Sequence, residues 1–136
     1  MDASPQQHHG CMIPDHNRLK RMKDFEILFK EGKFVSGNII GAKIWKIDPT
    51  KYPKRGYVET DLKIGFVASV KHEKKAVGRN RVKRQMREVV RLLVKDGRIK
   101  SGYFIAFLST PKLIGAEYEA IAEDIESILK KARVLV

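Results

Sequence analysis

Hydrophobic residues spaced three and four positions apart predict three helices along the chain. They cover residues 22–30, 77–95 and 116–131. Gly32 follows the first of them and is predicted to end it in the left-handed conformation, which glycine adopts without steric cost. The third helix carries acids near its start and lysines near its end, the arrangement that the helix dipole favours.

Shorter apolar runs predict the strands. Residues 34–47 are expected to form two strands hinged at Gly37–Asn38, and residues 62–70 and 103–108 one strand each. The stretch 48–61 holds two prolines and a glycine and is predicted to be a loop. The resulting order, α-β-β-β-α-β-α, indicates an α+β fold: a single-domain two-layer sandwich with helices on a mostly antiparallel sheet.

The composition points to a polyanionic partner. The chain has 136 residues, enough for one domain, and carries 28 lysines and arginines against 16 acids, a formal net charge of +12. Such a surplus repels itself in the folded state and is usually retained for binding nucleic acid or an anionic membrane surface. No apolar run approaches the roughly 20 residues needed to cross a bilayer, so we expect no membrane integration.

The N-terminal region differs in character from the rest. Residues 1–16 lack periodicity and are predicted to be a disordered tail, which leaves 17–136 as the domain. The single cysteine, Cys11, allows no intrachain disulfide, as is usual in the reducing cytoplasm, where we expect the protein. Cys11 is accompanied by His8, His9 and His16, but their spacing matches no common zinc pattern, and no metal site is expected.

The second predicted helix carries the strongest functional signal. One of its faces is apolar and comprises Val82, Met86, Val89, Val90 and Leu93. Another face is cationic and comprises Asn80, Lys83, Arg84, Arg87 and Arg91, with Arg79 at the helix start and Arg81 turned away from the main row. Arginine offers a planar fork that suits phosphate oxygens. A solvated helix face usually alternates in sign, whereas here only Glu88, four residues after Arg84, can neutralise a cation, so the row predicts phosphate binding.

A family resemblance appears at residues 79–88, which read RNRVKRQMRE. This segment resembles the RNR signature of the bacterial ribonuclease P protein family, R-N-R-x-K-R-x-x-R-E, at every specified position. A weaker match lies upstream, where Asn17-Arg18-Leu19-Lys20, Asp24-Phe25 and residues 29–32 look like the family's first helix. The resemblance covers about residues 17–133.

The resemblance implies a fold, an activity and partners. It implies a central mixed sheet in which the basic helix joins two parallel strands by a left-handed crossover, opposite to the general rule. It implies the protein component of ribonuclease P, which binds the catalytic RNA and the 5′ leader of precursor tRNA and promotes endonucleolytic removal of that leader. The RNA subunit with magnesium would carry the hydrolysis, so we expect an enzyme subunit without catalytic residues of its own, one per RNA.

The resemblance also implies site residues. Contacts with the RNA subunit are expected from Arg79, Asn80, Arg81, Lys83, Arg84 and Arg87, and we add Arg91 from the same helix. A cleft for the single-stranded leader is expected to include Phe25, Phe29, Lys43, Trp45 and Lys71. Aromatic faces stack on unpaired bases of any sequence, which suits a leader that differs among tRNAs. From the residues alone, Phe25 and Phe29 are equally well explained as core residues, and Trp45 as a packed indole.

Two features depart from the family pattern. Lys43 stands where the family often has an aromatic residue on the cleft-facing strand, and Trp45 shares that face two residues on. Before the RNR segment, residues 74–77 read KKAV where the family usually has G-N-A-V, with an extra residue after the strand. This insertion leaves the roles of Ser69, Lys71 and His72 open.

Two other functions compete with this interpretation. A general RNA-binding module would explain the charge but not the motif, and it would not prefer precursor over mature tRNA. A metal-dependent nuclease acting alone would use Asp48, Glu59 and Asp61. These acids lie in or beside a loop without a paired metal-site pattern and are more simply explained as solvated.

Overall fold

The computed structural model describes residues 13–68 and 75–136 and confirms the predicted order of elements. Its helices are α2 (Met22–Glu31), α3 (Ala76–Lys95) and α4 (Tyr118–Lys131). Its strands are β1 (Lys33–Ser36), β2 (Ile40–Lys46), β3 (Leu62–Val67) and β4 (Tyr103–Ser109). Short 3-10 turns lie at η1 (Asp15–Asn17), η2 (Pro53–Arg55) and η3 (Pro111–Leu113). Among the described residues, no helix is long and apolar enough to span a membrane.

The four strands form one mixed sheet in the order β1-β2-β4-β3. β1 pairs with β2 and β2 with β4 in antiparallel fashion, while β3 and β4 are parallel. α3 lies between β3 and β4 in the sequence, as expected for the helix that joins two parallel strands. The left-handed course of this crossover stays a prediction.

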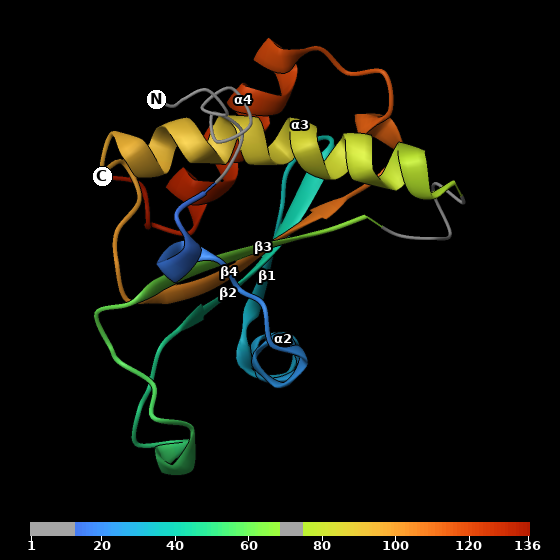
Figure 1. Ribbon diagram of the computed structural model, residues 1–136. Coiled ribbons are helices and arrows are strands. Elements are labelled where there is room, and N and C mark those ends of the chain that lie inside the picture. Colours follow the sequence, from blue (N-terminus) through green and yellow to red (C-terminus); the bar gives the residue numbers. More distant parts are fainter. Residues whose placement is uncertain (1–12, 69–74) are drawn as a thin grey trace, which may run out of the picture.

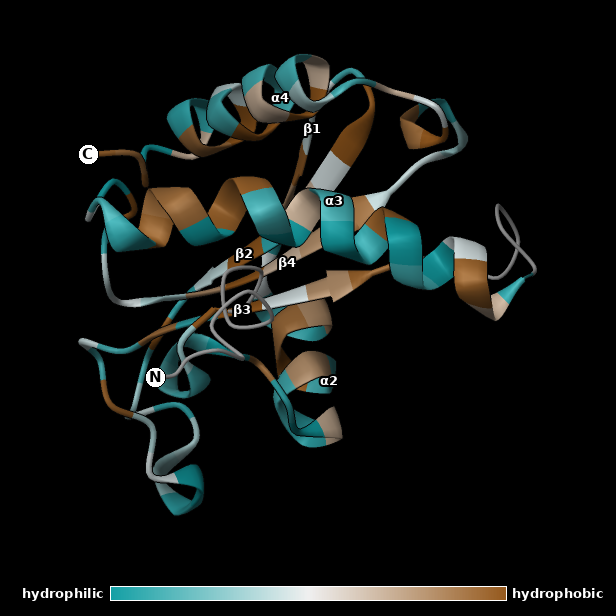
Figure 2. Cartoon of the chain, turned by 45° about the horizontal axis from the view of Figure 1, so that its top comes forward, coloured by the Kyte–Doolittle hydropathy of each residue, from teal (hydrophilic) through white to brown (hydrophobic). Residues whose placement is uncertain are grey.

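The helices divide between the two faces of the sheet. α3 and α4 lie together on one face, and α2 lies on the other (Figure 1). The apolar stripe predicted for α3 is buried in full, and brown and teal positions alternate along the ribbon of this helix (Figure 2). This burial orients the helix, because the cationic residues are left to face outward.

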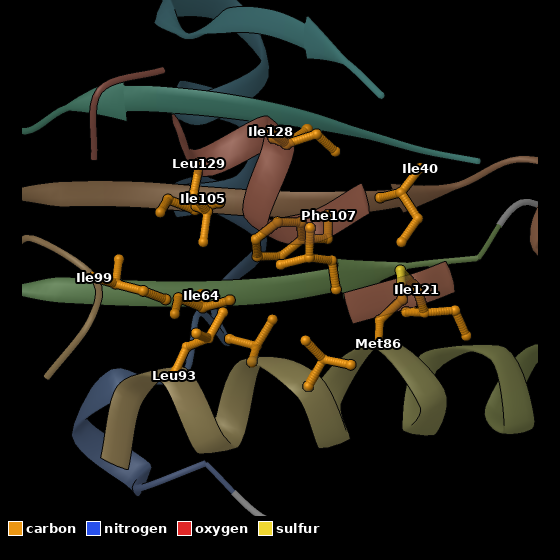
Figure 3. Packing of buried hydrophobic residues seen from close by; sticks show 14 of the residues in the cluster. Ile40, Ile64, Met86, Leu93, Ile99, Ile105, Phe107, Ile121, Ile128 and Leu129 are labelled. Carbon is orange, nitrogen blue, oxygen red and sulfur yellow. The ribbon is translucent and has the colours of Figure 1, made fainter. Parts of the chain in front are cut away.

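The main core fills the space between the sheet and this helix pair. Leu93 reaches from α3 toward Ile64 on β3, while Met86 lies beside Ile121 of α4 (Figure 3). Phe107 lies between the strands and α4. Ile40, Ala42 and Ile44 of β2 belong to the same cluster. Strand alternation thus places the intervening β2 residues on the opposite face, toward α2.

Gly32 ends α2 in a way that the sequence did not predict. Its φ is −76°, an extended conformation rather than a left-handed one, so that prediction was wrong. Its N–H donates to the Leu28 carbonyl oxygen at 2.8 Å. A Cβ at this position would lie 2.6 Å from the Leu28 oxygen and 3.1 Å from the Ile44 oxygen. Glycine is therefore needed here for close backbone approach, not for a positive φ.

The packed region begins earlier than the predicted boundary at Asn17. Ile13 is 3% exposed and belongs to the main core. Asn17 then donates from Nδ2 to the Leu62 carbonyl oxygen at 2.8 Å. Within the predicted tail, residues 1–12 lie outside the described part of the chain.

A buried carboxylate ties α4 to the β1–β2 hairpin. Asp124 is 4% exposed and accepts hydrogen bonds from the backbone N–H groups of Asn38, Ile39 and Ile40 at 2.6, 3.1 and 2.8 Å. A Cβ on Gly37 would lie 2.4 Å from the Asp124 carboxylate, so the predicted turn at Gly37–Asn38 packs directly against this side chain. The sequence analysis missed this contact.

Candidate nucleic-acid interface

The predicted RNA-binding residues on the outward side of α3 differ in their exposure to solvent. Asn80, Arg81 and Arg84 are exposed, whereas Arg79 and Lys83 are half-buried. The N-terminal end of α3 projects past the strands (Figure 2). No acid occupies the first turn of the helix. Because the helix dipole and these cations have the same sign there, this end favours a polyanion.

Two further arginines of α3 interact with their surroundings. The Arg87 guanidinium lies 5.8 Å from the centroid of the Phe66 ring, a cation–π arrangement that holds it against β3. Arg91 Nη2 lies 3.4 Å from Glu88 Oε1. The predicted neutralising partner of Glu88 was Arg84, so the structure corrects this pairing, and Arg91 is partly neutralised by Glu88.

A basic groove separates α3 from the α2 side of the molecule. This α2–α3 groove has a volume of about 320 Å³. It is lined by Ile13, Arg18, Leu19, Lys20, Phe25, Ile64, Gly65, Phe66, Lys83 and Arg87. Its lining contains four cations and no carboxylate. Arg18 and Lys20 also pair with Asp15, which lies outside this lining. An aromatic ring beside several cations is the combination that proteins use for single-stranded nucleic acid.

The floor of the α2–α3 groove is shaped by a glycine. A Cβ on Gly65 would lie 2.5 Å from Cζ of Phe25, so the ring rests directly on the β3 backbone. Phe25 is half-buried, and Phe29 is 38% exposed. The two rings stack with centroids 6.4 Å apart and an interplanar angle of 26°. Neither side chain is fully buried, so the core explanation does not account for both.

Trp45 is not exposed in a cleft, as the predicted role in leader binding required. It is 7% exposed, and its ring packs edge-on against Tyr52, Tyr57 and Phe104 with centroids 5.4 to 6.1 Å apart. The packed-indole alternative therefore describes this residue, and a stacking role for it is set aside. The sequence could not reveal this, because the tyrosines that cover the indole come from the loop at 48–61.

An exposed aromatic residue that the sequence analysis missed lies beside Lys43. Phe34 on β1 is the Cα partner of Lys43 on β2 and is 57% exposed. A Cβ on Gly41 would lie 2.8 Å from the Phe34 ring, so this ring also rests on a bare strand. Alternation along β1 could have identified it once the hairpin register was known. Lys71, the remaining predicted cleft residue, lies outside the described residues.

The loop at 48–61 fastens α2 in place. Asp24 Oδ1 accepts hydrogen bonds from Arg55 Nη2 at 2.8 Å and from the Tyr57 hydroxyl at 2.7 Å. Burial and the bond to Asp24 raise the pKa of Tyr57, which keeps its hydroxyl a donor at neutral pH. At the other end of the helix, Glu31 accepts from Lys51 at 2.7 Å. These contacts hold α2, and hence Phe25, at a set distance from the sheet.

The structure shows the surroundings of the acids that a metal-dependent nuclease would use. Asp48 accepts hydrogen bonds from the Thr50 N–H at 3.0 Å and the Thr50 hydroxyl at 2.6 Å, and these bonds lower its pKa. Glu59 is exposed. Within residues 13–68 and 75–136, no three His, Cys, Asp or Glu side chains are grouped so that they could hold a metal ion.

Sequence comparisons identify relatives over nearly the whole described chain. Residues 13–133 match the family model described as Ribonuclease P. The ribonuclease P protein component of Pseudanabaena sp. (strain PCC 6903) is 35% identical over 124 residues, which are 91% of this chain and 97% of the relative. That of Caldanaerobacter subterraneus subsp. tengcongensis is 31% identical over 114 residues, 84% of this chain and 87% of the relative.

Solved structures show the same architecture. The RNase P protein from Thermotoga maritima is 27% identical, with a TM-score of 0.65 over 84% of this chain and 96% of that one. The RNase P protein of Staphylococcus aureus is 23% identical, with a TM-score of 0.68 over 88% of this chain and 98% of that one, a likeness that concerns the fold alone. The mixed α+β fold is therefore shared with both.

Proposed function

Because the chain belongs to the ribonuclease P protein family and is thus a protein component for tRNA processing, we propose that it binds the ribonuclease P RNA and the 5′ leader of precursor tRNA. In the holoenzyme it promotes endonucleolytic removal of the leader, which leaves the mature tRNA 5′ end. The catalytic RNA, with its magnesium ions, performs the hydrolysis. One protein acts with one RNA in the cytoplasm.

The observation that carries this proposal is the α2–α3 groove. It brings Phe25, from the first helix, to the same cavity as Lys83 and Arg87, from the RNR segment. A single strand in this groove can stack a base on the phenyl ring while its phosphates meet cations on both sides. The exposed residues Asn80, Arg81 and Arg84 point outside the groove and are left for the RNA subunit.

The protein's contribution under this proposal is differential binding. Precursor and mature tRNA differ in the leader, so only the precursor gains the contacts of the groove. Cations near RNA phosphates also take over part of the screening that magnesium would otherwise supply. A smaller magnesium requirement and a preference for the precursor therefore have the same origin.

The decisive measurement is cleavage of a precursor tRNA at low magnesium by the cognate catalytic RNA, with and without this protein, plus a protein-only reaction. We expect strong stimulation with no cleavage by the protein alone. Absence of stimulation by the folded protein would indicate a general RNA binder. Cleavage in the protein-only reaction would instead support a nuclease.

Phe25→Leu is expected to weaken binding of the leader while keeping apolar volume on α2. Loss of one base-stacking contact is worth about 1–3 kcal/mol, so the affinity of the holoenzyme for a precursor with a leader falls about tenfold or more. Binding of a leaderless tRNA stays the same. Met22→Leu serves as the control, because Met22 lies on the same helix, is 74% exposed and does not line the groove. Equal discrimination by the Phe25 variant and the unchanged protein would show that Phe25 only packs.

A further inference from the structure

A second basic groove lies at the end of β1, apart from the first. This β1-edge groove has a volume of about 790 Å³ and shares no lining residue with the α2–α3 groove. It forms where β1 begins at Lys33 opposite Ile44, so that Trp45–Ile47 continue past the end of the edge strand. The last turn of α4 and the residues after it close the other side.

The β1-edge groove carries an excess of positive charge. Its cations are Lys33, Lys46, Lys51, Lys131 and Arg133, against the two carboxylates Glu31 and Asp48. Both carboxylates are already engaged, since Lys51 pairs with Glu31 and the Thr50 hydroxyl donates to Asp48. Among the described residues, the side chains of Lys33, Lys46 and Arg133 have no hydrogen-bond or ion-pair partner. These three cations are available to a phosphate-bearing ligand.

One of these cations occupies a position that usually favours glycine. Arg133 has a φ of 61° and is the only non-glycine residue with a positive φ among the described residues. It follows Ala132, the C-cap of α4, at the position where a left-handed residue commonly closes a helix. An arginine at such a position is conformationally unfavourable, so local backbone geometry does not account for its presence.

Phe34 connects this groove with the face that carries α2. The ring is 57% exposed and belongs to the groove lining. Its Cα partner is Lys43, on the face of the sheet that α2 covers. The exposed ring, resting on Gly41, therefore marks the rim between the cleft side of the sheet and the β1-edge groove.

We propose that the β1-edge groove binds the upstream part of the precursor leader, after the strand has passed the α2 face and Phe34. This inference rests on the proposed function. The occupant is single-stranded RNA because the groove offers an exposed aromatic ring together with lysines, the pattern of sequence-tolerant single-strand sites. The outward row of α3 instead offers exposed arginine and asparagine along one rigid helix, which suits backbone contacts with structured RNA.

The test variant combines Lys46→Ala with Arg133→Gly. Glycine at position 133 removes the cation and suits the left-handed backbone, so the melting temperature is not expected to fall. The control combines Lys54→Ala with Lys112→Ala, which removes the same charge from exposed positions outside both grooves. Affinities of the reconstituted holoenzyme are measured for precursors whose leaders are lengthened one nucleotide at a time.

The test variant is expected to bind short-leader precursors normally and to lose about tenfold in affinity for long leaders at low salt. Each lost phosphate contact also removes about 0.7 from the slope of log affinity against log salt for a single strand. The control shows no dependence on leader length. An equal loss at every length, a weaker affinity for the RNA subunit alone, or no loss at all would each overturn the proposal. Stimulation of cleavage at low magnesium by the unchanged protein tests the proposed function separately, so the two failures are distinguishable.

Discussion

Replacing Asp124 with alanine is expected to lower the free energy of unfolding by about 3–5 kcal/mol, the range for losing a buried charged acceptor that serves several donors. The carboxylate is 4% exposed and is the acceptor for three successive backbone N–H groups of the β1–β2 hairpin. The bond from the Ile40 N–H is buried, so water cannot easily replace the carboxylate there and that donor is left unsatisfied. Urea unfolding followed by circular dichroism measures the change.

The neighbouring residue offers a matched control. Glu123 is exposed on the same helix, and Glu123→Ala is expected to change the stability by less than about 0.5 kcal/mol. Asp124→Asn keeps one acceptor oxygen and is expected to fall between the two. A loss below about 1 kcal/mol for Asp124→Ala would mean that the hairpin is held to α4 mainly by apolar packing.

Removing both Arg81 and Arg84 is expected to have the largest effect on binding of the RNA subunit. Both side chains are exposed on α3, opposite its buried stripe, so their replacement by alanine leaves the core intact. Each phosphate contact contributes about 0.7–0.9 to the slope of log affinity against log salt, so the double variant lowers that slope by about 1.5. At low salt the affinity falls about 10- to 100-fold.

The measurement is a salt titration of binding to the ribonuclease P RNA alone, without tRNA. Lys54→Ala with Lys112→Ala again supplies the control for net charge, because both lysines are exposed and belong to η2 and η3 rather than to α3. Matching melting temperatures establish that the variants are folded. If the slope and the affinity of the arginine variant equal those of the control, the outward side of α3 is not the RNA-binding surface.

The local elements of the fold were accessible from the sequence. The order of strands and helices and the buried stripe of α3 follow from hydrophobic periodicity. Periodicity is readable because the helix repeat and the strand repeat are properties of the backbone itself. The RNR segment was readable for the same reason: its cations lie close together in the chain, and a helix places them on the surface once its apolar side is buried.

The placement of the aromatic residues needed the tertiary structure. Trp45 was a candidate for stacking, but Tyr52 and Tyr57 from the following loop cover it. Phe34 was not among the predicted cleft residues, yet it is exposed beside Lys43. Burial depends on which distant segment packs over a side chain, and neither strand alternation nor composition records that choice.

The elements, the basic helix and the family resemblance could be predicted from the sequence, because each depends on residues close together in the chain. The partners of polar groups and the shapes of the grooves depend on how distant segments pack. Asp124 meets the hairpin across 84 to 86 positions of sequence. A Cβ on Gly32 would also lie 3.1 Å from the Ile44 carbonyl oxygen of β2, which comes near only after folding. Such contacts form between surfaces that folding brings together, and a pattern of neighbouring residues cannot specify them.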